Sequence, residues 1–436
     1  MTSSVINLPK FILYSYLIII VFCGTLNPFQ FPYLSSIIDV VNIFLIAAFF
    51  IFGLFMKREY AFNVYKVDLI ILSVITLLTI PSIVLNELIN SAHLFKHFYP
   101  IRIFFTYKIF SFIYHEFTLK NKRPISLYDF LNPLIAISIV SALLSIIRYL
   151  PLPIGFLIND IWPIVSNGEI QGQLLWGRLW GTMGGTNTAG NFFTLVSFLS
   201  LCAFYIDEKR RYIYPYLLFS LCVLLSLSFT SIFSYLAGLA FIFQKKISLK
   251  VIFSSVFVLF TILFLVNQNE TLNQIATKRI SANFSEENRR GSILPENLQA
   301  RIGYWKNFLE LSNDKELHFL YGFGPGGVRM YKNNIRGINI RGNPESFYFR
   351  IYNESGLIGL VAIFGLLFYF YQRLYRLKKI QILQIDYIFI SLVFFLILIQ
   401  SIANEPIYSN GVTQIFTFFL FYITVLPSKL TLDNKF

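Results

Sequence analysis

The chain has 436 residues, of which 56% are hydrophobic and 13% are charged, whereas about a quarter of the residues in an ordinary soluble domain are charged. A soluble core cannot bury that much apolar surface, so we expect most side chains to face lipid or one another within a membrane. The formal net charge of +14 comes from basic residues between apolar runs, which indicates membrane orientation rather than a nucleic-acid partner.

Apolar runs along the whole chain predict an all-α fold, a polytopic integral membrane protein of about 12 transmembrane helices forming one domain over residues 1–436. A crossing needs about 20 apolar residues. The predicted spans are 11–27, 37–55, 67–85, 95–117, 131–150, 190–206, 213–228, 230–243, 251–266, 355–371, 385–403 and 411–427. The first run lacks a small-residue cleavage motif, so we interpret it as a span rather than as a removed signal peptide.

If the N-terminus is placed on the cytoplasmic side of the membrane, every second connection between predicted spans lies on that side and carries basic residues. The predicted inner segments carry Lys57/Arg58/Lys66, Lys120/Lys122/Arg123, Lys209/Arg210/Arg211, Lys245/Lys246/Lys250, Arg373/Arg376/Lys378/Lys379 and Lys429/Lys435. The short outer connections at 28–36, 86–94, around 229 and 404–410 contain no Lys or Arg. This pattern follows the positive-inside rule and predicts a multi-pass protein of the bacterial inner (plasma) membrane, with both termini cytoplasmic.

Arg102 and Lys108 lie within the fourth predicted span. Charge at that depth is costly and usually faces a bundle interior or a water-filled cavity. Arg102 is therefore a candidate substrate contact, and snorkelling or helix pairing is the alternative interpretation.

Two outer connections are long, 151–189 and 267–354, and we expect them to form the active-site side of the protein. The second contains many Lys and Arg residues, among them Arg301, Arg329 and Arg341. Concentrated positive charge at the outer membrane surface suits a lipid-linked phosphate or pyrophosphate. A solvated loop without a ligand is the alternative.

The first long connection ends in a glycine-rich stretch from Arg178 to Asn191, directly before a predicted helix. Glycines allow close approach of the backbone, and amides at a helix N-terminus together with an arginine suit a phosphate. Asn187 belongs to this stretch and is a candidate substrate contact. Glycine-rich turns before spans are common, however, so the motif alone does not define a site.

The second long connection contains three distinct stretches. Residues 301–305 open an amphipathic helix that holds Arg301 and Trp305, and residues 321–327 form a glycine-rich chain reversal that is not a P-loop. In the third stretch, 341–359, Glu345 lies among arginines and could act as general base on a sugar hydroxyl, with Tyr348 as a neighbouring substrate contact. A salt-bridged loop acid is the alternative for Glu345.

Neither an HExxH nor a CxxC metal-binding motif is present in the sequence. The four histidines form no HExxH pattern, and the three cysteines lie inside apolar runs without a CxxC motif. We therefore expect a metal-independent mechanism without a cofactor.

Three stretches together, 178–191, 301–305 and 321–359, resemble the O-antigen polymerase and O-antigen ligase superfamily of bacterial surface-polysaccharide assembly. The resemblance covers about 175–370 and implies a GT-C-like fold and a glycosyltransferase that uses an undecaprenyl-pyrophosphate-linked glycan donor. It also implies that Arg178 and Arg301 grip the pyrophosphate leaving group. The position of the histidine found in the ligases is occupied here by Glu345, followed by Ser346, which favours a Wzy-type polymerase.

The resemblance thus predicts polymerisation of lipid-linked repeat units into O-antigen or capsular polysaccharide at the outer face of the membrane. Glu345, Arg178 and Arg301 are the predicted catalytic residues, with Arg341 and Arg329 as helpers. A lipid-linked donor and acceptor, a chain-length regulator and a flippase are the expected partners. The alternatives are an O-antigen ligase and, from another class, a polytopic transporter or flippase, although no repeated halves typical of transporters are visible.

Overall fold

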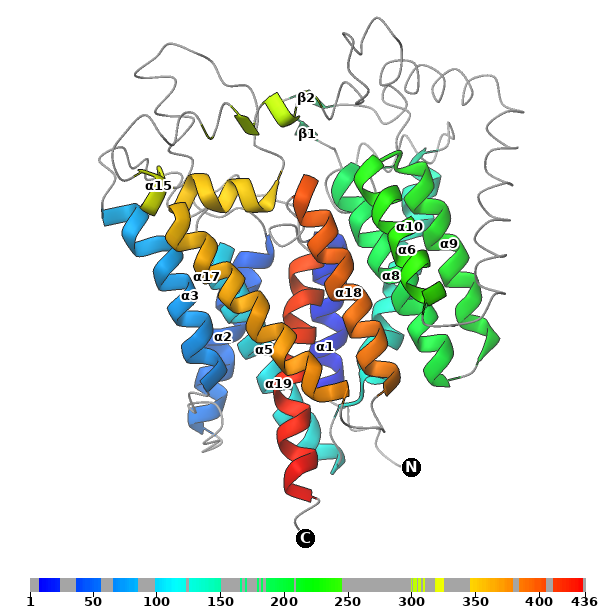
Figure 1. Cartoon of the computed structure of the whole chain (residues 1–436). Helices are drawn as coiled ribbons and strands as arrows, with labels where there is room; N and C mark the ends of the chain where they lie inside the picture. Colours follow the sequence, from blue (N-terminus) through cyan, green and yellow to red (C-terminus); the bar gives the residue numbers. More distant parts are fainter. Residues whose placement is uncertain are drawn as a thin grey trace, which may run out of the picture.

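The computed structural model is a bundle of α-helices, with the short elements β1, β2 and α15 at one end (Figure 1). It describes residues 8–23, 37–55, 66–84, 99–122, 125–149, 165–166, 169–170, 179, 182, 186–207, 209–244, 299, 301–303, 305–306, 309, 318–324, 346–378, 384–404 and 411–433. The strands within this part of the chain are β1 (Val165–Ser166) and β2 (Glu169–Ile170), which pair antiparallel.

Every predicted span except 251–266 contains a helix, and that span lies outside the described residues. The first half of the chain forms α1 (Leu8–Ile18), its π-helical continuation η1 (Ile19–Cys23), α2 (Ile37–Phe55), α3 (Lys66–Val84), α5 (Tyr99–Asn121) and α6 (Leu127–Tyr149). The second half forms α8 (Thr186–Asp207), the short η5 (Arg210–Tyr212), α9 (Ile213–Leu225), α10 (Phe229–Gln244), α15 (His318–Tyr321), α17 (Phe347–Lys378), α18 (Gln384–Ala403) and α19 (Val412–Asp433).

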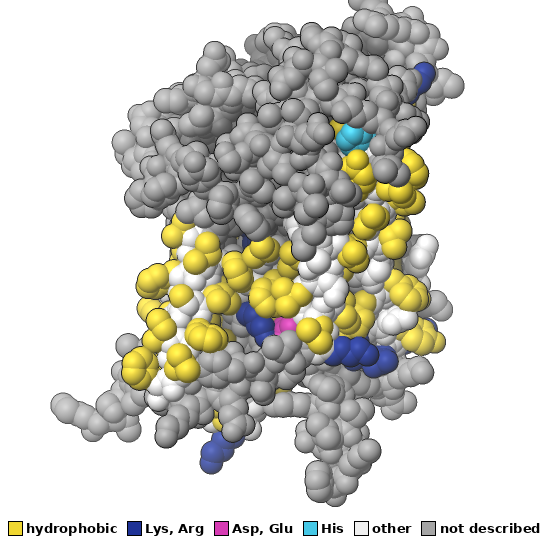
Figure 2. Space-filling view, turned by 90° about the vertical axis from the view of Figure 1, so that its left-hand side faces the viewer, with side chains coloured by type: hydrophobic (Ala, Val, Ile, Leu, Met, Phe, Trp, Pro, Cys, Tyr) yellow, Lys and Arg dark blue, Asp and Glu magenta, His cyan; other side chains and the backbone are white. Residues whose placement is uncertain are grey.

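Four of the described helices, α6, α8, α17 and α18, are long and apolar enough to cross a membrane. Shorter apolar stretches occur in α1, α2, α10 and α19. Large apolar side chains such as Phe44, Leu69 and Phe368 are exposed on the sides of the bundle, and Figure 2 shows hydrophobic side chains spread over one lateral face. A helical membrane protein is the class that this surface indicates, because lipid tolerates apolar exposure that water does not.

Helix α8 is deeply buried and packs against α6, α9, α10 and α18. Its residues 191–203 are all buried. Thr194 and Ser200 donate hydrogen bonds to carbonyls one turn earlier, at 2.8 Å each. This satisfies their hydroxyls inside an apolar environment, and the small side chains let neighbouring helices approach closely.

Helix α1 begins and α19 ends at the same end of the bundle, whereas β1, β2 and α15 lie at the other (Figure 1). We call the end that carries β1, β2 and α15 the loop end. The helix starts at Thr186, Phe347 and Val412 also lie at the loop end, so α8, α17 and α19 run in one direction and α9 and α18 run in the other.

Candidate functional site

Helix α17 is kinked where the sequence predicts the start of the tenth span. Gly356 has φ 63° and ψ −160°, which no right-handed helix contains. The segment before the kink, 347–355, lies across the loop end of the bundle, and the remainder slopes down through it (Figure 1). The kink therefore separates a surface segment from a span in one continuous helical stretch.

The glycine turn after α15 packs directly onto this kink. The backbone N–H of Phe323 donates to the carbonyl of Asn353 at 2.8 Å, and the N–H of Gly324 donates to the carbonyl of Glu354 at 3.1 Å. A helix break leaves carbonyls without intrahelical donors, and the two bonds supply donors from a separate segment of the chain. The chain reversal predicted at 321–327 is thus present at its described residues, 321–324, and is fixed to α17.

Two glycines make this close approach sterically feasible. Gly322 has φ +74°, and a Cβ built on it would lie 2.5 Å from the carbonyl carbon of Glu354. A Cβ on Gly356 would overlap the backbone of Leu320. Both positions require glycine for two reasons: the backbone has a positive φ, and a side chain would overlap neighbouring backbone atoms.

The kink is also tied to α3, because the hydroxyl of Ser355 donates to the carbonyl of Leu78 at 2.7 Å. On the surface segment itself, Arg350 forms an ion pair with Glu354 at 3.0 Å. These contacts hold the surface segment at a fixed place on the bundle.

Trp305 packs its indole on the ring of Phe349, with centroids 5.0 Å apart and an angle of 11° between the planes. Two of the stretches that carry the family resemblance, 301–305 and 321–359, therefore meet on the surface segment of α17. Arg301 belongs to the same short helical piece as Trp305 and is half-buried. His318 stacks on Phe323 at a centroid distance of 4.3 Å and adds to the packing of the glycine turn.

The start of α17 is held by the end of α18. The N–H of Phe347 donates to the carbonyl of Asn404 at 2.9 Å, and the hydroxyl of Ser346 donates to the carbonyl of Ser401 at 3.4 Å. The hydroxyl of Tyr348 is directed to the carbonyl of Leu398, at 3.5 Å. Tyr348 thus contacts the α18 backbone in this structure.

The stretch 178–191 enters the bundle between several helices. The N–H of Leu179 donates to the carbonyl of Leu225 at 2.9 Å, and the hydroxyl of Thr182 donates to the carbonyl of Val21 at 2.8 Å. Helix α8 then begins, with Asn187 half-buried in its first turn. The segment before α8 is therefore anchored to both η1 and α9.

A chain of polar contacts leads from this stretch to α18. The hydroxyl of Ser231 donates to the side-chain oxygen of Asn191 at 2.9 Å, and that of Ser234 donates to the carbonyl of Ser231, also at 2.9 Å. The amide of Gln400 donates to the hydroxyl of Ser234 at 3.3 Å. All three stretches are thereby joined at the loop end, through α10, α18 and α17.

Several predicted site residues lie outside the described residues: Arg178, Arg329, Arg341 and Glu345. Arg102 lies on α5 near its loop end and is 3% exposed, so it points into the bundle. Lys108, one and a half turns further along α5, pairs with the buried Asp68 of α3. Helix pairing is thus the explanation for Lys108.

Sequence reasoning missed Arg148, a second buried arginine near the loop end, on α6. It shares one helix face with the buried Ser141 and Ser145, and Ser141 exchanges a hydrogen bond with Thr182 at 2.7 Å. The sequence contains a signal for this buried arginine, because Arg148 is the one charged residue of the predicted span 131–150.

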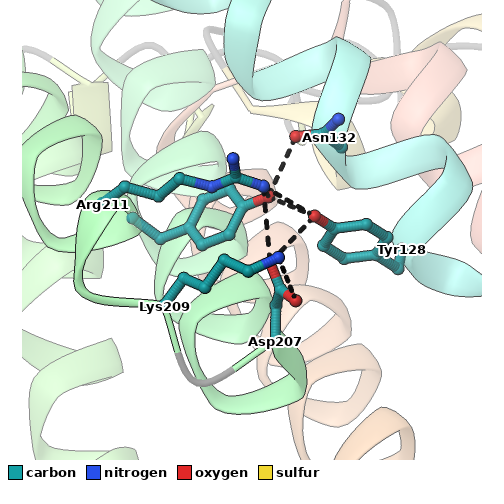
Figure 3. A network of polar contacts seen from close by, with 6 residues as sticks. Tyr128, Asn132, Asp207, Lys209 and Arg211 are labelled. Carbon is teal, nitrogen blue, oxygen red and sulfur yellow. Dashed lines mark hydrogen bonds and ion pairs between the residues drawn. The ribbon is translucent and has the colours of Figure 1, made fainter.

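A further polar cluster lies at the opposite end of the bundle, between α6, α8 and η5 (Figure 3). The hydroxyls of Tyr128 and Tyr212 are 2.6 Å apart, and Tyr128 donates to Asp207 at 3.0 Å. Arg211 donates to Tyr212 at 3.1 Å, and this hydrogen bond raises the pKa of Arg211 above its ordinary value. The cluster connects the α8–α9 turn to α6 and stabilises the fold at the end of the bundle opposite the loop end.

Within the described residues, no group of three His, Cys, Asp or Glu side chains is placed to hold a metal ion. The sequence matches no protein-family model, and no curated protein is similar to it.

Proposed function

We propose that this chain is an inner-membrane glycosyltransferase of the O-antigen polymerase type, with about twelve spans and both termini in the cytoplasm. The observation that carries the proposal is the packing of Trp305 on Phe349. It brings the arginine-containing stretch 301–305 onto the segment of α17 that directly follows Glu345. The alternation of basic loops supports an orientation in which the loop end faces outward.

In the proposed reaction, a hydroxyl oxygen of one lipid-linked repeat unit attacks the anomeric carbon of a glycan carried on a second undecaprenyl pyrophosphate. The new glycosidic bond forms as the bond to the pyrophosphate oxygen breaks. Glu345 accepts the hydroxyl proton, and Arg178 and Arg301 stabilise the charge on the departing pyrophosphate, with Arg341 or Arg329 nearby. Neither a metal nor another cofactor takes part.

The site would take two lipid-linked glycans at once, a donor and an acceptor, and the bilayer delivers both to the loop end of the bundle. Asn187, Trp305, Tyr348 and Arg102 are the proposed substrate contacts. A chain-length regulator and a flippase are the proposed protein partners.

The role of Arg301 can be tested by complementing a deletion strain with Arg301→Ala, using Lys306→Ala as the matched control on the same short helical segment. One lost electrostatic contact to a developing charge lowers a rate by roughly a hundredfold. We expect Arg301→Ala to reduce polymer beyond a single repeat by about that factor, and Lys306→Ala to restore full-length chains. Surface glycan resolved on a polyacrylamide gel is the readout, with protein levels matched by immunoblot.

Full-length polymer from Arg301→Ala at normal protein level would contradict the assigned role of this arginine. Equal loss from both variants would indicate a folding defect of the segment rather than a role in catalysis.

A further inference from the structure

Three carboxamide side chains are buried near the loop end of α18 and α19. Gln400 is 0% exposed, Asn404 is 6% exposed and Gln414 is 1% exposed. Gln400 lies in the last turn of α18, and Asn404 directly follows the end of that helix. Gln414 lies in the first turn of α19.

Each of these amides has one polar atom without a hydrogen-bond partner among the described residues. The atoms are the Oε1 of Gln400, the Nδ2 of Asn404 and the Nε2 of Gln414. The second polar atom is used in two of them: Gln400 donates to Ser234 at 3.3 Å, and Gln414 accepts the N–H of Gly411 at 2.7 Å. Gln400 and Gln414 are thus held in place, while one donor or acceptor of each of the three amides remains available.

Unpaired polar atoms at this degree of burial require an explanation. Native proteins pair the large majority of such atoms, and leaving one unpaired lowers stability. Apolar side chains of the same size would avoid that loss at all three positions. A ligand that pairs with these atoms when it binds accounts for their presence.

The position of the amides connects them to the candidate site. The backbone carbonyl of Asn404 accepts the N–H of Phe347, so this side chain lies beside the start of α17. Gln400 joins the polar chain that leads through Ser234 to α10 and α8. Asn404 therefore borders the segment that directly follows Glu345, and Gln400 lies one turn earlier in the chain, on α18.

The chemistry of the available atoms indicates the ligand class. Two donors and one acceptor, all uncharged, match the hydroxyl groups of a sugar, each of which both donates and accepts. A pyrophosphate would instead require cations, and an apolar chain would leave all three atoms unpaired. A neutral saccharide is thus the class that satisfies both kinds of atom.

We infer that Gln400, Asn404 and Gln414 form a subsite that binds hydroxyl groups of the saccharide in a lipid-linked glycan, separately from the pyrophosphate. The inference rests on the proposed function and extends it by assigning sugar recognition to α18 and α19.

The test compares two probes on the purified full-length protein in nanodiscs. One is the lipid-linked saccharide extracted from a strain that lacks this chain, and the other is undecaprenyl pyrophosphate without a sugar. Gln400→Met and Asn404→Leu each remove one amide at nearly constant volume. Asn42→Leu is the matched control, because Asn42 on α2 is also buried with its Nδ2 unpaired among the described residues, and its Oδ1 accepts only a bond from Tyr16 at 2.8 Å.

We expect each subsite variant to raise the Kd for the lipid-linked saccharide about tenfold and to leave the Kd for undecaprenyl pyrophosphate unchanged. The melting temperature without probe should stay the same or rise, since an unpaired buried amide is removed. The control should leave the ratio of the two Kd values at its wild-type level.

Three results would overturn the inference while the proposed function stands. They are an unchanged Kd for the saccharide in both variants, an equal loss of affinity for both probes, and a wild-type protein that binds the two probes with the same affinity. A wild-type protein that binds neither probe would instead reject the proposed function, and the subsite with it.

Discussion

A single backbone conformation at Gly356 sets the geometry of the loop end. A residue with a Cβ at φ +63° is strained by about 1 to 3 kcal/mol, and the added carbon would also meet the backbone of Leu320. The same helix offers an ideal comparison in Gly365, where an added Cβ has no neighbour within 4 Å. Position 356 therefore requires glycine, whereas position 365, nine residues further along the same helix, has space for a side chain.

We expect Gly356→Ala to lower the free energy of unfolding by at least about 2 kcal/mol, because it combines a strained φ with a steric clash. Gly365→Ala should be neutral or should stabilise the helix by about 0.5 to 1 kcal/mol, as alanine does in a helix interior. Thermal unfolding of both variants in detergent measures the difference. If the two variants melted at the same temperature, the kink would not depend on a glycine at 356.

The sequence predicted the glycine turn, but it did not predict which segment of the chain the turn contacts. The pattern at 321–327 indicates a reversal because glycine adopts positive φ, and Gly322 and Gly324 do so at +74° and +71°. The carbonyls of Asn353 and Glu354 that receive the turn are about thirty residues further along the chain. Local pattern cannot identify such a pairing, because it depends on where α17 bends.

Among the elements, α3 and α5 are joined by a charged pair inside the bundle. The ammonium group of Lys108 binds the carboxylate of Asp68, and the two side chains are 22% and 1% exposed. Removing one member of such a pair costs about 3 to 5 kcal/mol, whereas replacing both with apolar groups is often neutral. The exposure difference makes the two members unequal, since a lysine can extend its amine toward polar surroundings and a short aspartate cannot.

We therefore expect Lys108→Met to destabilise the protein more than Asp68→Leu does, because it leaves a carboxylate buried without this cation. The double variant should recover most of the lost stability. A double-mutant cycle from thermal or denaturant unfolding gives the coupling free energy directly. Additive losses in the double variant would show that the pair does not couple α3 to α5.

The helices themselves were largely predictable, and the deviations have physical causes. Helix α17 begins at Phe347, eight residues before the predicted span at 355, because its surface segment carries Arg350, Asn353 and Glu354 and lacks the hydropathy of a span. The joining of Asn191 to Gln400 through serines of α10 was not predictable, since these residues are far apart in the sequence.

The whole molecule combines an apolar helical bundle with polar residues at its loop end. The described elements β1, β2 and α15 lie at the end opposite the start of α1 and the end of α19 (Figure 1). The three stretches that resemble the polymerase and ligase superfamily are linked there by contacts of their described residues. We propose that this end of the bundle forms an outward-facing site for a lipid-linked glycan.

The most direct test is the surface-glycan profile of a strain lacking this chain, analysed together with its extracted undecaprenyl-linked sugars. A polymerase predicts that the ladder collapses to core plus a single repeat, while single lipid-linked repeats accumulate. Long polymer retained on undecaprenyl pyrophosphate would instead indicate a ligase. An unchanged ladder with normal lipid-linked sugars would contradict the proposed polymerase.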